Sequence, residues 1–233
     1  LVHARPPECV VFVDKCYGEL VQEHAPTQVR AHLIAGPLIK NLGGTIAPTG
    51  GYVAGRAALV EQACCRLTAP GIGREGGTGF DLQRLVLQGL FLAPQMVAEA
   101  LIGADLVAGV FQRLGFAVNP GPGADRSDLI QAVRLGSPES LKLVCRAFQA
   151  CSPVGAYLDP VPASMPGYAS DLVMAGGTFI DGSTSEFSAD APLREPFNLY
   201  VQGGTHRAHV QLALTRALSV LDAAGLIDLP LTV

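Results

Sequence analysis

The sequence is poor in charge and has no long apolar run, and each shortage narrows the functions open to it. Only 15% of the 233 residues are charged, the net charge is −4 and no basic stripe is present, so we expect no nucleic-acid partner. The low charge and the 49% hydrophobic content favour a well-buried core over disorder. No apolar run is long enough to span a bilayer and no signal peptide opens the chain, so we expect no membrane association and a cytoplasmic location.

Motifs for binding metals or nucleotides are missing or stand in the wrong context. His206 and His209 share a helix face without a carboxylate or cysteine partner, so no metal site is predicted. The six cysteines show no metal-ligand spacing, and buried free thiols are the simplest interpretation. Gly71, Gly73 and Gly76 spell G-x-G-x-x-G, but the string follows a predicted helix instead of a strand. A connector is therefore favoured over a nicotinamide site.

Lysine is scarce, and one of the three lysines ends an apolar run. Residues 33–39 form that run, which stops at Lys40 and opens into a loop with two adjacent glycines. An amine among apolar neighbours loses solvation of its charged form, so we expect the pKa of Lys40 to fall, as a Schiff-base lysine requires. The alternative is a lysine at a strand end whose aliphatic side chain lies on apolar surface while its ammonium group stays in water.

An acid stands at the end of the preceding apolar run. Residues 8–14 predict a buried strand that ends at Asp14. If this strand and the one before Lys40 are parallel neighbours, their carboxyl ends open on the edge where ligands bind in open α/β sheets. A carboxylate and an amine in one crevice suit pyridoxal phosphate, because the amine holds the aldehyde and the carboxylate keeps the pyridine nitrogen protonated. The alternative is that Asp14 caps the following turn.

Periodicity and turn residues predict an α/β chain whose character changes near residue 120. Pro94 should break or kink the long central helical region, and Ser137 is the expected N-cap of a later helix. Before residue 120 we expect a short strand at 52–55 and helices at 56–67 and 80–115. After it we expect a polar turn at 118–127, a strand at 128–134 and a helix to Cys151. The chain should end with paired strands at 171–181 and 184–188 joined by Asp181-Gly182-Ser183, a strand at 197–201 and a helix at 205–224.

Several long segments together resemble one family. They are VFVDKCYGEL, AHLIAGPLIKNLGGTIAPTGGYVAG, RLTAPGIG, and the run from YLDPVPASMPGY through MAGGTFIDGSTSEFSADAPLR to YVQGG. With them the chain resembles, over nearly all its length, the pyridoxal-phosphate-dependent methionine gamma-lyase-like family, also called cystathionine β-lyase or aluminium resistance proteins. Family members are longer at the N-terminus, so the resemblance implies that this chain matches their C-terminal half or slightly more.

The resemblance implies the fold of the aspartate aminotransferase type, fold type I of the pyridoxal-phosphate transferases. Residues 1–80 would complete the large cofactor-binding domain, residues 81–116 would form linking helices, and residues 117–233 would form a small α+β domain. The implied function is a carbon–sulfur lyase that acts on a small-molecule sulfur amino acid by β- or γ-elimination, assembled as a homodimer or homotetramer. The alternative is a catalytically silent, truncated homologue or an interaction module that keeps the lyase framework.

The resemblance also assigns roles to four residues. Lys40 matches the lysine that forms the imine with the cofactor, and Asp14 matches the acid at the pyridine nitrogen. Tyr17 is placed to hydrogen-bond the phenolic oxygen of the cofactor, with a core tyrosine as the alternative. Arg194 is the candidate for the substrate carboxylate, with a structural ion pair as the alternative.

Three positions depart from the family pattern. Pro37 stands where the family usually has a serine whose hydroxyl can contact the cofactor phosphate. His32 replaces an aspartate, and Lys15 replaces an asparagine. The first departure removes one expected hydrogen bond to the phosphate.

Overall fold

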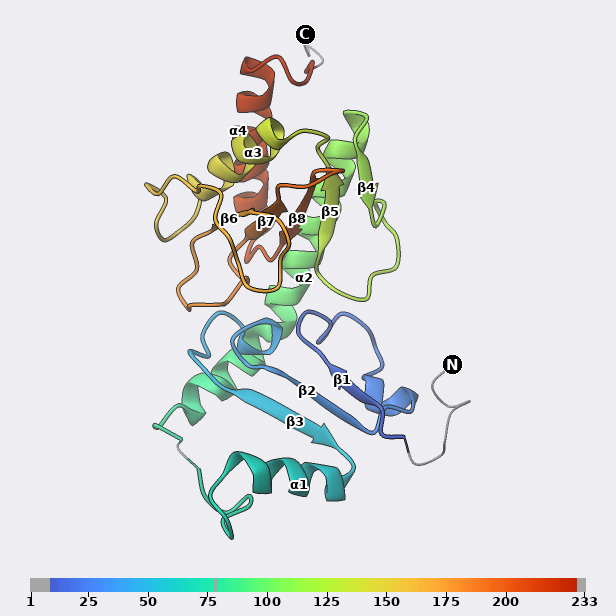
Figure 1. Cartoon of the computed structure of the whole chain (residues 1–233), viewed down its shortest axis with the longest axis vertical. Coiled ribbons are helices and arrows are strands. Elements are labelled where there is room, and N and C mark those ends of the chain that lie inside the picture. The colour runs from blue at the N-terminus through green and yellow to red at the C-terminus, as the bar shows by residue number, and fades with distance from the viewer. Residues whose placement is uncertain (1–8, 78, 230–233) are drawn as a thin grey trace. The chain divides into compact units, whose positions relative to one another are not determined.

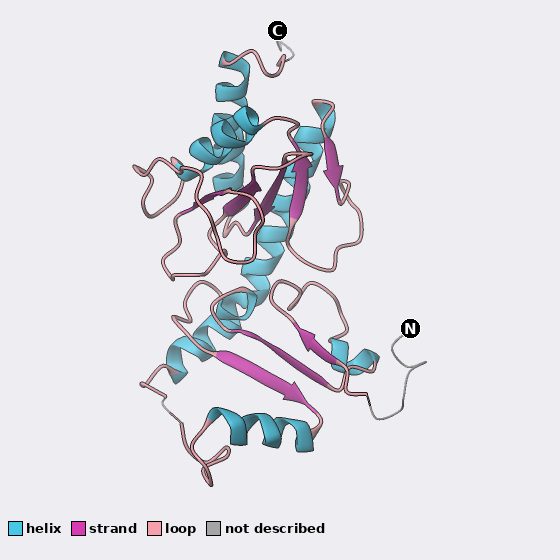
Figure 2. Cartoon of the chain, in the orientation of Figure 1, coloured by secondary structure: helices cyan, strands magenta, loops and turns pink. Residues whose placement is uncertain are grey.

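The computed structural model describes residues 9–77 and 79–229, in two compact units (Figure 1). The division falls between Ala93 and Pro94, inside the helix α2 (Gln83–Arg113). Each unit carries a sheet and helices, and Figure 2 shows both kinds of element in each. The chain is therefore an α/β protein with four α-helices and two separate sheets in its described part.

The first unit is built on a three-stranded mixed sheet. Its strands are β1 (Phe12–Asp14), β2 (Leu33–Pro37) and β3 (Gly51–Gly55), in the order β1-β2-β3. β1 runs parallel to β2 and pairs Asp14 with Ala35, which confirms the parallel neighbours expected from the sequence. β3 is antiparallel to β2. The helix α1 (Ala57–Leu67) packs beside β3, and the short 3-10 helices η2 (Pro26–Val29) and η3 (Asn41–Gly43) flank β2.

The strand β1 is exposed, although its sequence predicted a buried strand. Val10 and Phe12 are 51% and 56% exposed, because β1 forms an edge of the sheet and no described strand covers its outer side. Residue 8 of the predicted strand lies outside the described residues. Ile34 on the central strand is buried, so the core of this unit follows β2.

The loop after Lys40 lies directly against α2. A Cβ at Gly89 would overlap the carbonyl oxygen of Gly43, and a Cβ at Gly44 would overlap that of Gly89. Gly44 also has φ = 51°, a conformation that costs other residues energy. The paired glycines therefore allow the backbone of the loop to touch the backbone of the helix.

The second unit contains a five-stranded antiparallel sheet with the order β4-β5-β8-β7-β6. The strands are β4 (Ala117–Asn119), β5 (Gln131–Arg134), β6 (Leu172–Gly176), β7 (Ser188–Pro192) and β8 (Asn198–Gln202). The helix α3 (Pro138–Gln149) packs on β6 and β7 and against α4 (Arg207–Ala223). A single parallel sheet continuing from the first unit is thus excluded for the described strands.

The buried apolar core is concentrated in the second unit. It joins α2, both later helices and the sheet through side chains that are at most 5% exposed, including Phe111, Val133, Leu141, Phe148, Val173, Leu199, Val210 and Leu221. Ser137 caps α3 by accepting a hydrogen bond from the backbone N–H of Ser140, as its sequence predicts. The order of the second unit therefore rests on a contiguous hydrophobic core.

The predicted hairpin around Asp181-Gly182-Ser183 is wrong in its turn, although two strands of that region do pair. β6 and β7 are antiparallel and pair Gly176 with Ser188, so residues 177–187 form a long loop. This loop turns inward: Glu186 and Phe187 are 2% and 3% exposed, and burial raises the pKa of Glu186. The strand β4 was also missed, because its three residues lie at the edge of a stretch whose Gly and Pro content predicts a turn.

The helix α2 corrects the expectation that no segment is long enough to cross a bilayer. It has 31 residues, and an 18-residue window within it reaches a mean hydropathy of 1.6. Pro94 lies inside this continuous helix. Core helices of soluble proteins can have the same length and composition, so this property alone does not place α2 in a membrane. The expected absence of membrane association stays a prediction.

Within the second unit, an ion pair joins α2 to the start of α4. Arg207 donates to Glu99 Oε1 through Nη2 at 2.6 Å and to Oε2 through Nε at 3.1 Å. Its backbone N–H also donates to Oε2, at 2.7 Å. The Glu99 side chain is only 5% exposed. These bonds satisfy a donor at the N-terminus of α4 and hold the pKa of Glu99 at about 2.

Replacing Glu99 by Gln is expected to lower the free energy of unfolding at neutral pH. The folded-state pKa lies below the ordinary 4.5, so the stabilisation is complete above that value and is lost as the pH falls toward 2. Urea denaturation of wild type and Glu99→Gln should therefore differ at neutral pH and converge near pH 2. Glu61→Gln is the control, because its pair with Arg74 joins side chains that are 51% and 70% exposed. A difference that does not change with pH would contradict this assignment.

Candidate active site

Lys40 and Tyr17 meet at the end of the central strand. Lys40 follows β2 by three residues, and Tyr17 lies in the turn after β1. The amine Nζ of Lys40 donates a hydrogen bond of 2.6 Å to Tyr17 Oη. The same amine lies 4.1 Å from the centre of the Tyr17 ring, within the range of a cation–π contact. The structure thus brings together two of the predicted site residues.

The pKa of Lys40 is raised, whereas the sequence predicted that it would fall. Burial does lower it, as expected for an amine among apolar neighbours. The hydrogen bond to Tyr17 and the other interactions with the Tyr17 and Cys16 side chains favour the charged form, and their combined effect is larger. Without a cofactor, Lys40 is therefore an ammonium at neutral pH, and Nζ must lose a proton before it can attack an aldehyde.

Asn41 fixes the turn that carries Tyr17. Its side-chain Nδ2 donates to the carbonyl oxygen of Tyr17 at 3.2 Å and to that of Glu19 at 2.9 Å. Asn41 is 6% exposed, so these bonds are shielded from water. Because Asn41 directly follows Lys40, one loop carries both the amine and the side chain that anchors the Tyr17 turn.

A buried carboxyl group lies behind this turn. Glu19 is 4% exposed and accepts a hydrogen bond of 3.1 Å from Tyr52 Oη on β3. Burial raises the pKa of Glu19, and burial beside that carboxyl group raises the pKa of Tyr52. Gly36 makes room for this packing, because a Cβ there would overlap the carbonyl oxygen of Lys15 and crowd Glu19 and Tyr52.

Asp14 ends β1 on the same edge of the sheet but does not contact the amine. Its strand is the parallel neighbour of β2, and its side chain is exposed. In the part of the chain that the structure describes, no hydrogen bond or ion pair joins Asp14 to Lys40. Its charge does reach Glu19 and Tyr52, whose pKa values it raises. The role of Asp14 at a pyridine nitrogen stays a prediction.

Arg194 lies in the second unit, in the turn between β7 and β8. Its backbone carbonyl accepts a hydrogen bond from the N–H of Phe197, and its side chain is exposed. It lines a small hollow of about 60 Å³, together with Pro192, Glu195, Pro196, Asn198 and Tyr200. Lys40 and Arg194 belong to different units. Recognition of a substrate carboxylate by Arg194 therefore stays a prediction.

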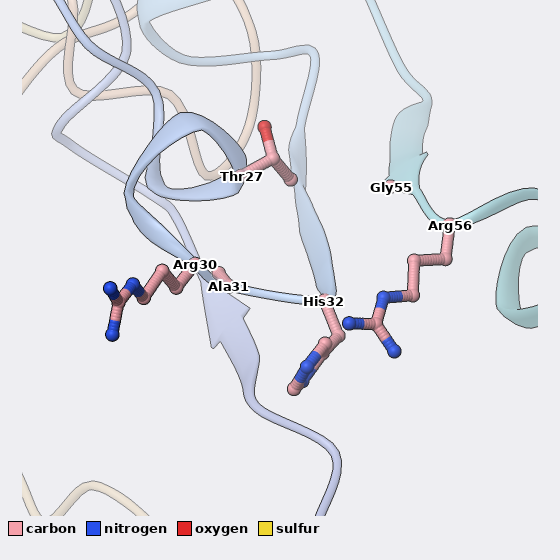
Figure 3. Close-up of a pocket in the computed structure, with 6 residues that line it drawn as sticks. All are labelled: Thr27, Arg30, Ala31, His32, Gly55 and Arg56. Carbon is pink, nitrogen blue, oxygen red and sulfur yellow. The ribbon is translucent and has the colours of Figure 1, made fainter. Parts of the chain in front are cut away.

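A larger hollow, of about 660 Å³, lies at the opposite end of β2 (Figure 3). Its lining includes Arg30, His32 and Arg56, and Figure 3 shows the last two side chains extending near one another while Arg30 points away. His32 precedes the strand that Lys40 follows, so the length of β2, roughly 16 Å for five residues, separates this hollow from the amine. His32 Nδ1 accepts a hydrogen bond from the backbone N–H of Val11, which gives it a structural role.

Asn41, Glu19 and Tyr52 were not predicted as parts of this site, because no local sequence pattern marks them. Their contacts join residues that are 22 to 33 positions apart in the chain. The two histidines of the later helix have structural contacts. His206 caps α4 and His209 bonds to the carbonyl oxygen of Cys151. All six cysteines are free, but only Cys145 is buried, so the expectation of buried thiols was mostly wrong.

These observations define an α/β protein with a lysine–tyrosine pair at the carboxyl end of parallel strands. A family model described as methionine gamma-lyase matches residues 1–222, and the chain belongs to this family. An uncharacterized Bacillus subtilis protein, YnbB, is 47% identical over 218 residues, which cover 94% of this chain and 52% of that protein. The chain thus spans about half the length of this relative.

Solved structures agree with the family assignment. A Listeria innocua protein, named as a candidate cystathionine beta-lyase involved in aluminum resistance, is 48% identical, with a TM-score of 0.89 over 94% of this chain and 53% of that one. A carbon-sulfur lyase involved in aluminum resistance from Clostridium novyi is 43% identical, with a TM-score of 0.88 over 94% and 51%. A likeness to metB from Corynebacterium glutamicum, at 15% identity and a TM-score of 0.55, shows a shared fold alone.

Proposed function

We propose that the full gene product that carries this chain is a pyridoxal-phosphate-dependent carbon–sulfur lyase of the aspartate aminotransferase fold type. The observation that carries the proposal is the bond from Lys40 Nζ to Tyr17 Oη beyond the carboxyl ends of β1 and β2. Ligands of open α/β sheets bind at this edge. The family match and the names of the Listeria and Clostridium proteins support a lyase that breaks a carbon–sulfur bond.

The residues at this edge fit the aldehyde and ring portions of the cofactor. Lys40 offers a half-buried primary amine, and Tyr17 offers a phenol at hydrogen-bonding distance from it. Asp14 offers a carboxylate at the end of the neighbouring parallel strand. The phosphate portion has one contact fewer than expected, because Pro37 has neither a hydroxyl nor a backbone N–H to donate.

Each side chain then has a defined task. Lys40 Nζ would hold the aldehyde end of the cofactor and, when free, would accept the proton from the substrate Cα. Tyr17 Oη would keep Nζ oriented, and the Asp14 carboxylate would hold a proton on the ring nitrogen. Bound pyridoxal phosphate supplies an electron sink for the pair left at Cα. Loss of a thiol from the β or γ carbon, followed by uptake of one water, would give the thiol, a keto acid and ammonia.

The products of the reaction test this function, because a transaminase would use the same three residues. We expect the full gene product, supplied with pyridoxal phosphate, to release a thiol, a keto acid and ammonia in equal amounts from cystathionine or methionine. Thiol is measured with a chromogenic disulfide and ammonia with an enzyme-coupled assay. Amino-group transfer to an added keto acid, without release of thiol, would contradict a lyase. Absence of both reactions in protein that binds the cofactor would favour the silent homologue.

Assembly is a further part of the proposal. By resemblance we expect a homodimer or homotetramer, and α2 carries an apolar stripe that is compatible with one. Leu87, Leu90 and Phe91 are 58%, 46% and 81% exposed and follow the i, i+3, i+4 spacing of one helix face. Sedimentation of the full gene product measures its oligomeric state directly.

A further inference from the structure

We propose that Asn41 is a positioning residue that sets the protonation state of the Lys40 amine by holding Tyr17 in place. This inference rests on the proposed function, which makes Lys40 the amine that receives the cofactor. Asn41 itself would not react with the substrate. Its effect depends on the connection between two loops, one that carries the amine and one that carries the phenol.

The turn that carries Tyr17 needs an anchor. The turn between β1 and Glu19 contains Gly18 and lies beyond the end of the sheet, where ladder hydrogen bonds no longer hold it. The backbone N–H of Lys15 still bonds to the carbonyl oxygen of Ala35, at 2.8 Å. Beyond that point, the carbonyl oxygens of Tyr17 and Glu19 bond to the Asn41 side chain.

This anchor is fixed to the amine. Asn41 adjoins Lys40 and begins η3, whose Gly43 lies against the backbone of α2. The donor Nδ2 therefore sits on a loop that packing holds in position. Because both of its bonds reach across to the turn, they set the distance between the Tyr17 backbone and the Lys40 backbone. A side chain without this donor would remove both bonds between the Asn41 side chain and the turn, and the turn would be held more loosely, by the packing of Glu19 and its bond to Tyr52.

This anchor affects the reactivity of the Lys40 amine. The bond from Lys40 to Tyr17 is the main interaction that opposes the effect of burial on Lys40. Cys16 and Tyr17 are the titratable groups whose interactions raise the pKa of this amine. If the turn moves, that support weakens and burial is left to act. Asn41 thus controls the charge of Lys40 through Tyr17, without a direct contact to Nζ.

The test measures the pKa of Lys40 in the absence of cofactor, in the full gene product. Competitive acylation with acetic anhydride across a pH series, followed by peptide mapping, reports each lysine separately, and Lys15 and Lys142 serve as internal standards. We expect Tyr17→Phe to shift the Lys40 midpoint downward. Asn41→Ala should shift it in the same direction, and the double variant should shift no further than Tyr17→Phe alone. Gln62→Ala removes an exposed amide on α1 and should leave the midpoint unchanged.

A merely structural role would give a different pattern. An unchanged Lys40 midpoint in Asn41→Ala, or shifts that add in the double variant, would overturn the inference. If Asn41→Ala does not fold, Asn41→Ser is used, together with amide hydrogen exchange of residues 17–19, which should become faster than in wild type. An unchanged midpoint in Tyr17→Phe would show that the Lys40–Tyr17 contact itself is absent. The lyase assay judges the proposed function independently, because it measures thiol release in the loaded wild-type protein.

Discussion

Replacing Lys40 by Ala is expected to abolish the visible absorbance and the lyase activity of the full gene product. Lys40 is the lysine that directly ends an apolar run, and its amine meets Tyr17 at the edge where parallel strands end. No other amine is expected to replace it. Loss of proton transfer alone should lower the rate by about 10²–10⁴-fold. The visible absorbance of the bound cofactor and the release of thiol, measured on the same samples, report the two losses.

A matched control separates this effect from a general loss of positive charge. Lys142→Ala removes a lysine from α3 in the second unit and should leave both colour and activity unchanged. Unchanged colour in Lys40→Ala would contradict the assignment of the amine. Pro37 is expected to weaken cofactor binding, because it lacks the hydroxyl that the family pattern places at this position. Each missing hydrogen bond to the charged phosphate, such as the one lost with Pro37, should weaken binding by about 1.5–3 kcal/mol, or tenfold or more.

Gly203→Ala is expected to cause a large loss of stability in the second unit. Gly203 follows β8 with φ = 79°, and a Cβ there would overlap the carbonyl oxygen of Thr184 in the loop before β7. Left-handed strain costs about 1–2 kcal/mol and overpacking about 1–3 kcal/mol, so the free energy of unfolding should fall by about 2–5 kcal/mol. Urea denaturation followed by far-ultraviolet circular dichroism measures the change.

A second glycine separates the free-energy cost of the steric clash from that of the left-handed backbone. Gly225, after α4, has φ = 68°, but a Cβ there would meet nothing within 4 Å. Gly225→Ala should therefore show only the cost of the left-handed backbone, about 1–2 kcal/mol. Equal losses in the two variants would mean that the contact with Thr184 contributes nothing, which would contradict the packing described for the loop.

Local sequence signals anticipated the elements that depend on neighbouring residues. The apolar run before Lys40 became β2, and the Ser137 cap formed as predicted, because both depend on residues a few positions apart. The strand pair after residue 170 shows the limit of such signals. Asp181-Gly182-Ser183 resembles a tight turn, yet burial of Glu186 and Phe187 draws the loop inward and moves the start of β7 to Ser188.

The sequence pointed to two residues whose side chains the structure brings into contact, Lys40 and Tyr17, but not to the direction of the Lys40 pKa. Lys40 was named from its position after an apolar run, and Tyr17 was named from the family resemblance. The direction of the Lys40 pKa was wrong, because burial can be inferred from adjacent residues but the opposing hydrogen bond comes from 23 positions away. Asn41 escaped prediction for the same reason, since its side chain bonds to carbonyl oxygens of a distant turn.

Reduction of the cofactor-loaded protein with borohydride shows which lysine holds the cofactor. The reagent fixes pyridoxal phosphate to the amine that holds it, and mass spectrometry of the digested protein then locates the modified lysine. In this chain the candidates are Lys15, Lys40 and Lys142. Within this chain we expect the label on the peptide that contains Lys40, and we expect the visible absorbance to disappear on reduction. A label on Lys15 or Lys142 would contradict this expectation.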